Sequence, residues 1–323
     1  MRRMLTIDGG GVRGIIPAVL LAALERATGR PTRETFDFIA GSSTGAVLAA
    51  GIAAGIPAER LVTLYASRSP QVFRSVPLLS GLRRLLTGTI YDTATLHRLI
   101  RDELGPEARD WTLNDAPVDL LVTAKRLVDG MPWYFVRDNP ANSCRAGGFR
   151  LADAVTASAA APTYFRPWSV APIGELIDGG IGVAGNPVYQ ACVEAFEYTH
   201  AYEPADTLVV SLGTGRLLRR QRPTWLWPWV GWLLSELLRS PAEQQTEIVH
   251  RHYPQASFYR LDLELEREIG LDAVDRLGEL QTHGERFASV VDWPAILESQ
   301  DQRFRVTDAT TLPRDYCRLG PAV

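Results

Sequence analysis

The sequence predicts an α/β fold with a mainly parallel central sheet. Short β-rich runs alternate with helical patterns of apolar residues along most of the 323 residues, which is typical of a sheet covered by helices on both faces. Glycine-rich turns directly follow three of the predicted strands, at residues 9–14, 41–45 and 213–215. Sites in open α/β sheets lie beyond the carboxyl ends of the strands, so we expect these turns to meet at one edge of the sheet.

The N-terminal part contains two strand–turn–helix units. RMLTI predicts a strand that stops at DGGGVRG, and the apolar residues of IIPAVLLAALERATG then recur at helical spacing up to Gly29, a predicted C-cap. The second unit joins the strand FDFIAG to the helix TGAVLAAGIAAG. Further helices are predicted in AERLVTLYASRSPQVF and TATLHRLIRDELG.

The remaining elements continue the alternation. VDLLVTAKRLVDGMPWYFV predicts two strands around an Asp-Gly turn, and RLADAVTASAAAPTYFRPW an alanine-rich helix that Pro162 stops. The strands GELIDGGIG and DTLVVSLGTG flank the helix NPVYQACVEAFEYT. We expect one domain over residues 1–300 and a more polar C-terminal tail over residues 301–323.

Composition excludes several classes of function. The formal net charge is −3, which argues against a nucleic acid polymer as a partner. The three cysteines, Cys144, Cys192 and Cys317, are too far apart in the sequence to predict a disulfide framework or a metal site. No segment reaches the roughly 18–20 consecutive apolar residues of a membrane span. We expect a soluble, cytoplasmic protein.

The run GSSTG fits the G-x-S-x-G pattern of a nucleophile elbow, with Gly41, Ser43 and Gly45 at the fixed positions. In such an elbow the serine occupies a strained turn between a strand and a helix, and the glycines let neighbouring backbone pass closely. The amides at the start of the helix then point toward the serine oxygen. The alternative is a small residue at a close strand–helix contact.

The run DGGGVRG has two interpretations. Gly9, Gly11 and Gly14 fit the dinucleotide fingerprint G-x-G-x-x-G. However, the nearest acidic candidate for ribose binding, Glu25, lies within the predicted helix and not at the end of the next strand. The glycines would otherwise leave backbone amides free to stabilise an oxyanion, which we favour, and a tight turn without a ligand is the third interpretation.

A serine nucleophile needs a base, and two residues are candidates. His283 follows Asp178 in the sequence, so a triad in α/β-hydrolase order is formally available. His283 falls within the predicted helix LGELQTHGERFA, where a solvated position is expected. Asp178 ends the apolar run ELID, which predicts a place at the end of a strand beside the glycine turns. A buried carboxylate there could take the serine proton directly.

Taken together and in this order, the motifs resemble those of the patatin-like phospholipases. IDGGGVRGIIPAVLLAALE is similar to the glycine-rich segment of that family, FDFIAGSSTG to its nucleophile elbow, ASAAAPTYFRP to its Ala/Pro stretch and LIDGG to its Asp-Gly-Gly motif. LVVSLGTG is similar to a later strand of the family. The resemblance extends from residue 5 to about residue 215 and continues more weakly to about 290.

The resemblance implies a three-layer α/β/α fold and a lipid acyl hydrolase that forms an acyl-serine and needs neither a metal nor a cofactor. Ser43 would be the nucleophile and Asp178 its base, in a dyad without histidine. Backbone amides of Gly9, Gly10 and Gly11 would form the oxyanion hole, with Arg13 as the family's basic residue nearby. The supporting positions of the motifs are Asp8, Gly14, Gly41, Gly45, Gly179 and Gly180.

The implied substrate is the surface of a phospholipid membrane, where the enzyme would be peripheral when active. RPTWLWPWVGWLLSELLRS, residues 222–240, carries four tryptophans and predicts either a membrane contact or a packed lid. VPLLSGLRRLLTG is a second candidate for covering the site. Related bacterial proteins include defence effectors switched on by cyclic nucleotides, so the resemblance makes such an activator a candidate partner, and a homo-oligomer is compatible with it. Two alternatives from other classes stay open: a nucleotide-binding module without catalysis, and a scaffold recruited to membranes.

Overall fold

A computed structural model describes most of the chain. It covers residues 1–73, 89–139, 147–217, 229, 244–267 and 269–299, together with the backbone of two short strands at 304–307 and 314–315. The tryptophan-rich segment 222–240, apart from Trp229, and the segment 76–88 lie outside the described residues. The alternatives of membrane contact and lid for these two segments therefore stay predictions.

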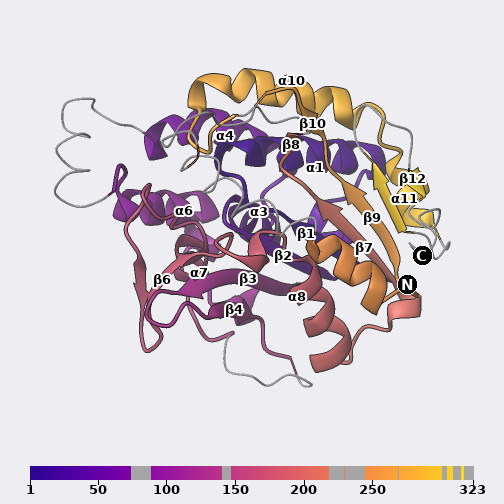
Figure 1. Ribbon diagram of the computed structural model, residues 1–323, viewed down its shortest axis with the longest axis horizontal. Coiled ribbons are helices and arrows are strands. Elements are labelled where there is room, and N and C mark those ends of the chain that lie inside the picture. Colours follow the sequence, from indigo (N-terminus) through magenta and orange to yellow (C-terminus); the bar gives the residue numbers. More distant parts are fainter. Residues whose placement is uncertain are drawn as a thin grey trace.

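A single large mixed sheet runs through the middle of the molecule (Figure 1). Its order is β12-β11-β9-β7-β1-β2-β3-β6-β5, with β4 also paired to β3. The strands are β1 (Arg2–Ile7), β2 (Phe38–Ser42), β3 (Asp119–Arg126), β4 (Pro132–Val136), β5 (Trp168–Val170), β6 (Gly174–Asp178), β7 (Thr207–Leu212), β9 (Ser257–Leu261), β11 (Phe304–Thr307) and β12 (Arg314–Asp315). The run from β11 to β3 is parallel throughout, whereas β4 and β6 are antiparallel to β3.

Helices cover both faces of the sheet because the strand residues alternate between two hydrophobic cores. In β1, Leu5 and Ile7 face the larger core, whereas Met4 faces the smaller one. The larger core is covered by α1 (Ile15–Thr28), α3 (Thr44–Ala53), α4 (Ala58–Val72), α6 (Thr93–Ala108), α7 (Leu151–Ser158), α10 (Leu277–Ala288) and α11 (Trp293–Glu298). The smaller core is covered by α8 (Val188–Val193) and helical residues 244–252. The expected three-layer α/β/α fold is therefore confirmed.

Two local predictions need correction, and a third stays untested. The alanine-rich helix ends at Ser158 and not at Pro162, because residues 159–161 form a turn whose Ala160 carbonyl accepts a bond from β6. The helix predicted after Asn186 is shorter than expected and passes into a π-helical turn, Glu194–Tyr198. Two strands of residues 301–323 join the sheet beyond β9, and the domain boundary at residue 300 stays a prediction.

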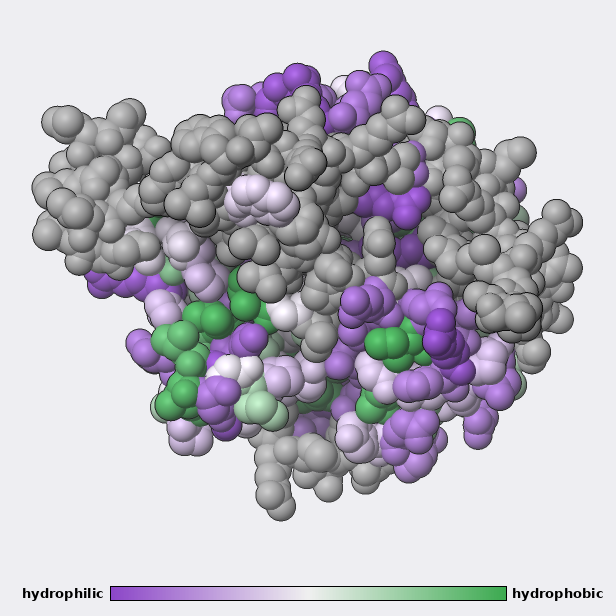
Figure 2. Space-filling view, in the orientation of Figure 1, coloured by the Kyte–Doolittle hydropathy of each residue, from purple (hydrophilic) through white to green (hydrophobic). Residues whose placement is uncertain are grey.

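The surface view mixes hydrophilic and hydrophobic side chains, with a group of hydrophobic ones on the side of the molecule where β6 lies (Figure 2). Among the described residues, no helix combines the length and the apolar character that crossing a bilayer requires.

Candidate active site

Ser43 stands at the apex of the turn between β2 and α3. Its backbone angles, φ 53° and ψ −120°, are unusual for a residue with a side chain and indicate local strain. The turn fits only because Gly45 lacks a Cβ, which would overlap the carbonyl oxygen of Ile7. Added Cβ atoms would likewise overlap neighbours at Gly14, Gly41 and Gly179. The structure therefore has the geometry of a nucleophile elbow at the predicted place.

Asp178 is the hydrogen-bond partner of Ser43. The Ser43 Oγ donates to Asp178 Oδ2 across 2.6 Å, and the Gly180 amide donates to Asp178 Oδ1, also across 2.6 Å. The Asp178 side chain is 3% exposed. Burial raises the pKa of Asp178 to about 6, although the bonds from Ser43 and Gly180 oppose the rise. A carboxylate with this pKa is ionised at neutral pH and can still accept a proton.

The route by which Asp178 reaches Ser43 differs from the expected one. We expected the carboxyl ends of parallel strands to bring the two residues together, but β6 runs antiparallel to β3. The register brings them together instead: Ser42 pairs with Thr123 on β3, and the next residue, Ala124, pairs with Asp178. Ser43, which follows Ser42, and Asp178 thus stand on either side of β3 at the level of Ala124.

The three glycines proposed for the oxyanion hole are not equivalent. The Gly9 amide already donates to the Gly185 carbonyl across 2.9 Å, so it is not available to a substrate in this structure. The amides of Gly10 and Gly11 have no hydrogen-bond acceptor among the described residues, and both glycines line the cavity next to Ser43. An oxyanion hole in this loop would therefore rest on Gly10 and Gly11.

Residues from two distant loops hold the glycine loop. Thr214 Oγ1 donates to the Gly9 carbonyl across 2.8 Å, and the Val12 amide donates to the Leu271 carbonyl, also across 2.8 Å. Arg13 contacts the loop itself, since its Nε donates to the Gly10 carbonyl across 3.3 Å. The glycine loop is thereby fixed by the loop after β7 and by the turn that contains Leu271.

Asp8 is part of a buried ion network at the edge of the cavity that Ser43 lines. Arg260 of β9 donates to both Asp8 oxygens, across 2.9 and 2.5 Å, and also to Asp262 and Ser211. Asp262 in turn accepts a bond from the Gly215 amide. Sequence reasoning missed Arg260 and Asp262. The available signal was an arginine within the otherwise apolar and aromatic strand SFYRL.

Ser158 also escaped sequence reasoning, although it lies in the ASAAAP stretch. Its Oγ accepts a hydrogen bond from the Ser43 amide across 2.8 Å, and its carbonyl accepts one from the Gly179 amide. The Ala160 carbonyl accepts a bond from the Asp178 amide. One buried turn at the end of α7 thus fastens both the nucleophile and the base.

We expect Ser158→Ala to lower kcat for a soluble ester about tenfold while leaving KM nearly unchanged. The variant leaves the buried Ser43 amide without an acceptor, which costs about 1–3 kcal/mol of stability and loosens the strained turn. Ser42→Ala is the matched control, because the Ser42 hydroxyl is buried without a hydrogen-bond partner among the described residues. Steady-state kinetics and thermal unfolding of both variants test the prediction, and a Ser158→Ala enzyme as fast as Ser42→Ala would contradict it.

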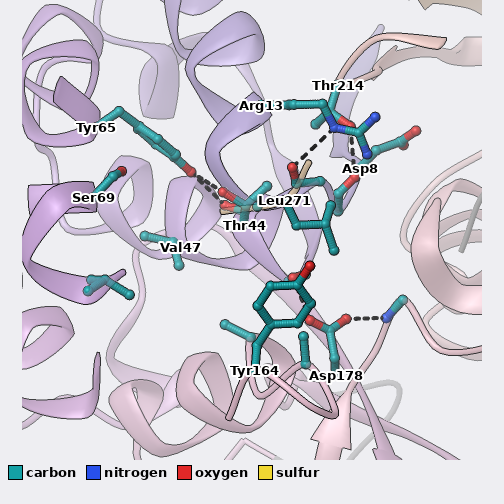
Figure 3. A pocket seen from close by; sticks show the side chains of 18 of the residues that line it. Asp8, Arg13, Thr44, Val47, Tyr65, Ser69, Tyr164, Asp178, Thr214 and Leu271 are labelled. Carbon is teal, nitrogen blue, oxygen red and sulfur yellow. Dashed lines mark hydrogen bonds between the residues drawn. The ribbon is translucent and has the colours of Figure 1, made fainter. Parts of the chain in front are cut away.

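An apolar cavity of about 220 Å³ opens beside the dyad. Figure 3 shows Asp178 and Tyr164 approaching it from one side, and Asp8 and Thr214 from the other. Side chains of α3, α4 and α6 form its apolar part, among them Val47, Leu61, Leu64, Leu96 and Ile100. A hydrocarbon chain suits this lining, and a carbonyl at its mouth would lie next to Ser43.

The histidine of the alternative triad and the acidic residue of the alternative dinucleotide site do not line this cavity. None of the described residues that line it is a histidine, and His283 stands on α10 with Nε2 3.9 Å from Glu279 Oε1. Glu25, the weak candidate for ribose binding, accepts bonds from the Thr32 and Ala58 amides. No cluster of His, Cys, Asp and Glu in the described part could hold a metal ion.

Comparisons with known proteins agree with the geometry. The family model described as patatin-like phospholipase matches residues 5–192. A cGAMP-activated phospholipase of Escherichia coli is 31% identical over 223 residues, which cover 66% of this chain and 62% of that protein. The mouse calcium-independent phospholipase A2-gamma is 28% identical over 321 residues, 94% of this chain and 39% of that protein.

The solved structure of VipD from Legionella pneumophila is a looser match. It has a TM-score of 0.42 and 13% identity, with coverage of 87% of this chain and 66% of that one, and such a likeness carries no functional argument. The chain spans less than two thirds of the length of the two curated relatives above.

Proposed function

Because this chain belongs to the patatin-like phospholipase family, we propose that it is a serine lipid acyl hydrolase that cleaves acyl esters of membrane phospholipids. The observation that carries the proposal is the 2.6 Å bond between Ser43 Oγ and Asp178 Oδ2 in a strained elbow. The adjoining apolar cavity offers a place for the acyl chain. If no apolar cavity adjoined Ser43 and Asp178, a smaller and more polar ester would be the favoured substrate.

In the proposed acylation step, Asp178 takes the proton of Ser43 while Ser43 Oγ bonds to the ester carbonyl carbon. The negative charge that develops on the carbonyl oxygen is stabilised by the amides of Gly10 and Gly11. The tetrahedral intermediate collapses, the bond to the leaving alcohol breaks, and the alcohol receives the proton from Asp178. The first product is thus a lysophospholipid.

Deacylation repeats the sequence with water. Asp178 takes a proton from a water molecule, whose oxygen attacks the carbonyl carbon of the acyl-serine. Collapse of the second tetrahedral intermediate breaks the bond to Ser43 Oγ, Ser43 regains its proton from Asp178, and a fatty acid leaves. Burial favours this use of a carboxylate, because it raises the pKa of Asp178 toward neutrality.

Lipid product analysis tests the proposed function. The chain is incubated with vesicles of phosphatidylethanolamine and phosphatidylglycerol without added metal, and the lipids are separated by mass. We expect equal amounts of fatty acid and lysophospholipid. Release of phosphate or of headgroup alcohol, or binding of NAD without any ester cleavage, would support a different enzyme or the nucleotide-binding module.

We further propose that a cyclic nucleotide activates the enzyme, on the precedent of the relative that is named for activation by cGAMP. A polar cavity of about 500 Å³ at the N-terminal edge of the sheet has the chemistry for its phosphates, since guanidinium groups bind phosphate oxygens well. Five arginines line this cavity: Arg2, Arg3, Arg30, Arg33 and Arg137. Glu34, Asp37 and Asp119 line it too, and ion pairs join Asp37 to Arg2 and Asp119 to Arg137. The opposite edge of the sheet carries Ser43, so activator and substrate would not compete.

Adding cGAMP to the vesicle assay is expected to raise the rate at least about tenfold, which corresponds to about 1.4 kcal/mol of coupling. Arg33→Ala should raise the cGAMP concentration for half activation, whereas Arg286→Ala, on the exposed side of α10, should not. A rate that cGAMP leaves unchanged would contradict the activator, and equal responses of the two variants would contradict its placement.

A further inference from the structure

The turn between β3 and β4 exposes hydrophobic side chains to an unusual degree. Val128 is 87% exposed, Met131 56% and Leu127 46%. Seven large hydrophobic side chains are exposed among the described residues, and three of them fall within residues 127–131, which we call the β3–β4 tip. Figure 2 shows hydrophobic side chains gathered on the side of the molecule toward which β3 runs. A cluster of exposed hydrophobic side chains of this kind indicates a site that contacts another molecule or a membrane.

The register places the β3–β4 tip next to the candidate active site. Ala124 pairs with Asp178, and β3 continues past that point to the Leu127 amide, which donates to the Glu175 carbonyl across 2.9 Å. Leu127 directly follows the end of β3 and stands three residues beyond Ala124, which at about 3.3 Å per residue is about 10 Å. Because β3 is parallel to β2, the tip projects from the same edge of the sheet as Ser43.

Hydrogen bonds within the β3–β4 tip hold its hydrophobic side chains at the surface. The Arg126 amide donates to the Met131 carbonyl across 2.9 Å, and the Gly130 amide returns a bond to the Arg126 carbonyl across 3.0 Å. Asp129 accepts bonds from the Met131 amide and from the Arg126 guanidinium. A turn fixed in this way does not fold back to bury Val128. Because the turn is already ordered, it loses little conformational entropy when it enters a lipid layer.

The charges around the tip, which include the exposed carboxylate of Glu175, suit the headgroup layer of a membrane. Arg126 and Asp129 neutralise each other, and Arg126 also lies over the Trp133 ring, 5.8 Å from its centroid. Lys125, the only lysine of the sequence, has no ion-pair partner among the described residues. Apolar side chains flanked by an amphipathic cation are suited to the boundary between lipid headgroups and acyl chains.

We propose that the β3–β4 tip inserts into the lipid surface and thereby holds the mouth of the Ser43 cavity against the bilayer. The inference rests on the proposed function for its substrate, but it concerns a different surface of the chain. With the tip in the headgroup layer, an acyl ester has only about 10 Å to cross between the start of the tip and the level of Asp178. This proposal attributes membrane docking to the β3–β4 tip and does not involve the tryptophan-rich segment.

Val128→Asp tests this docking surface in the full chain. Sedimentation with vesicles of phosphatidylglycerol and phosphatidylethanolamine measures binding, and hydrolysis is followed both on these vesicles and on p-nitrophenyl butyrate in solution. We expect vesicle binding and vesicle hydrolysis to fall about tenfold, since one buried valine is lost from the lipid phase. Hydrolysis of the soluble ester should not change. Val290→Asp is the matched control, because Val290 is 69% exposed in the turn after α10.

Val128→Trp should act in the opposite direction and increase vesicle binding, because tryptophan prefers the interface. Equal vesicle binding by Val128→Asp, Val290→Asp and the unaltered chain would overturn the docking surface, even if all three hydrolyse lipid. Tip-dependent binding without hydrolysis of either substrate would instead overturn the proposed function and leave the docking surface standing. The two failures are therefore distinguishable.

Discussion

Ser43→Ala is expected to lower ester hydrolysis about a thousandfold or more, because the variant has no nucleophile to form the acyl-enzyme. Stability should fall little, and the backbone strain at φ 53° remains in the variant. Ser42→Ala again serves as the control, since it removes a neighbouring buried hydroxyl that has no hydrogen-bond partner among the described residues. Rates on p-nitrophenyl butyrate and on vesicles, together with thermal unfolding, check the expectation.

Residual hydrolysis is informative in the same experiment. Water positioned by Asp178 could attack a bound ester directly, and such activity would be slow and would not pass through an acyl-enzyme. A Ser43→Ala enzyme that retains more than about a tenth of the rate would show that another group performs the reaction, provided that Ser42→Ala is fully active.

Asp178→Asn is expected to be nearly as damaging, at about a hundredfold or more, because an amide cannot take the serine proton. In the unaltered enzyme, kcat/KM should fall as the pH drops below about 6, since burial raises the pKa of Asp178 to about 6 and only the ionised form is a base. A rate-versus-pH profile measured with the soluble ester checks the position of this limb. A flat profile between pH 5 and pH 8 would contradict Asp178 as the base.

A measurement of stability distinguishes a variant that has lost its base from a variant that has lost its fold. The pKa of Asp178 is higher in the folded chain than the value of about 3.9 in an unfolded one. The folded state therefore binds the proton more tightly, and this carboxyl makes the free energy of unfolding decrease as the pH rises from about 4 to about 6. Asparagine carries no charge at any pH, so Asp178→Asn should be at least as stable as the unaltered chain at pH 8.

His283→Ala completes the comparison. His283 lies on α10 near Glu279 and does not line the cavity, so we expect less than a twofold change in rate. The opposite ranking, with a severe effect of His283→Ala and a mild one of Asp178→Asn, would restore the triad of an α/β-hydrolase.

Local patterns predicted the elements that local chemistry determines. The strand–turn–helix around GSSTG follows from small residues between two apolar runs, and Gly29 ends α1 with φ 66°, as a C-cap does. The position of Asp178 at the end of the apolar run ELID made it a candidate partner of Ser43, and the resemblance of ordered motifs implied the same pair. The expected parallel arrangement was wrong for β6, because strand direction depends on how distant segments cross and pair, which no local pattern encodes.

Contacts between distant side chains were the main omission. The bond from the Ser43 amide to Ser158 spans 115 positions, and that from Arg260 to Asp8 spans 252. A serine in an alanine-rich helix and an arginine in a strand have ordinary explanations until the fold brings their partners together. The hydrogen bond from the Gly9 amide to the Gly185 carbonyl likewise depends on the path of the loop that follows Asp178.

The central claim is that Ser43 carries the acyl group and that Asp178 activates it. The most direct test is the rate at which a fluorophosphonate ester modifies the chain, with the modified residue identified by mass spectrometry of the peptides. We predict one adduct on Ser43, formed quickly by the unaltered chain and at least about a hundredfold more slowly by Asp178→Asn. An adduct on another residue, or equal rates for the two proteins, would contradict the dyad.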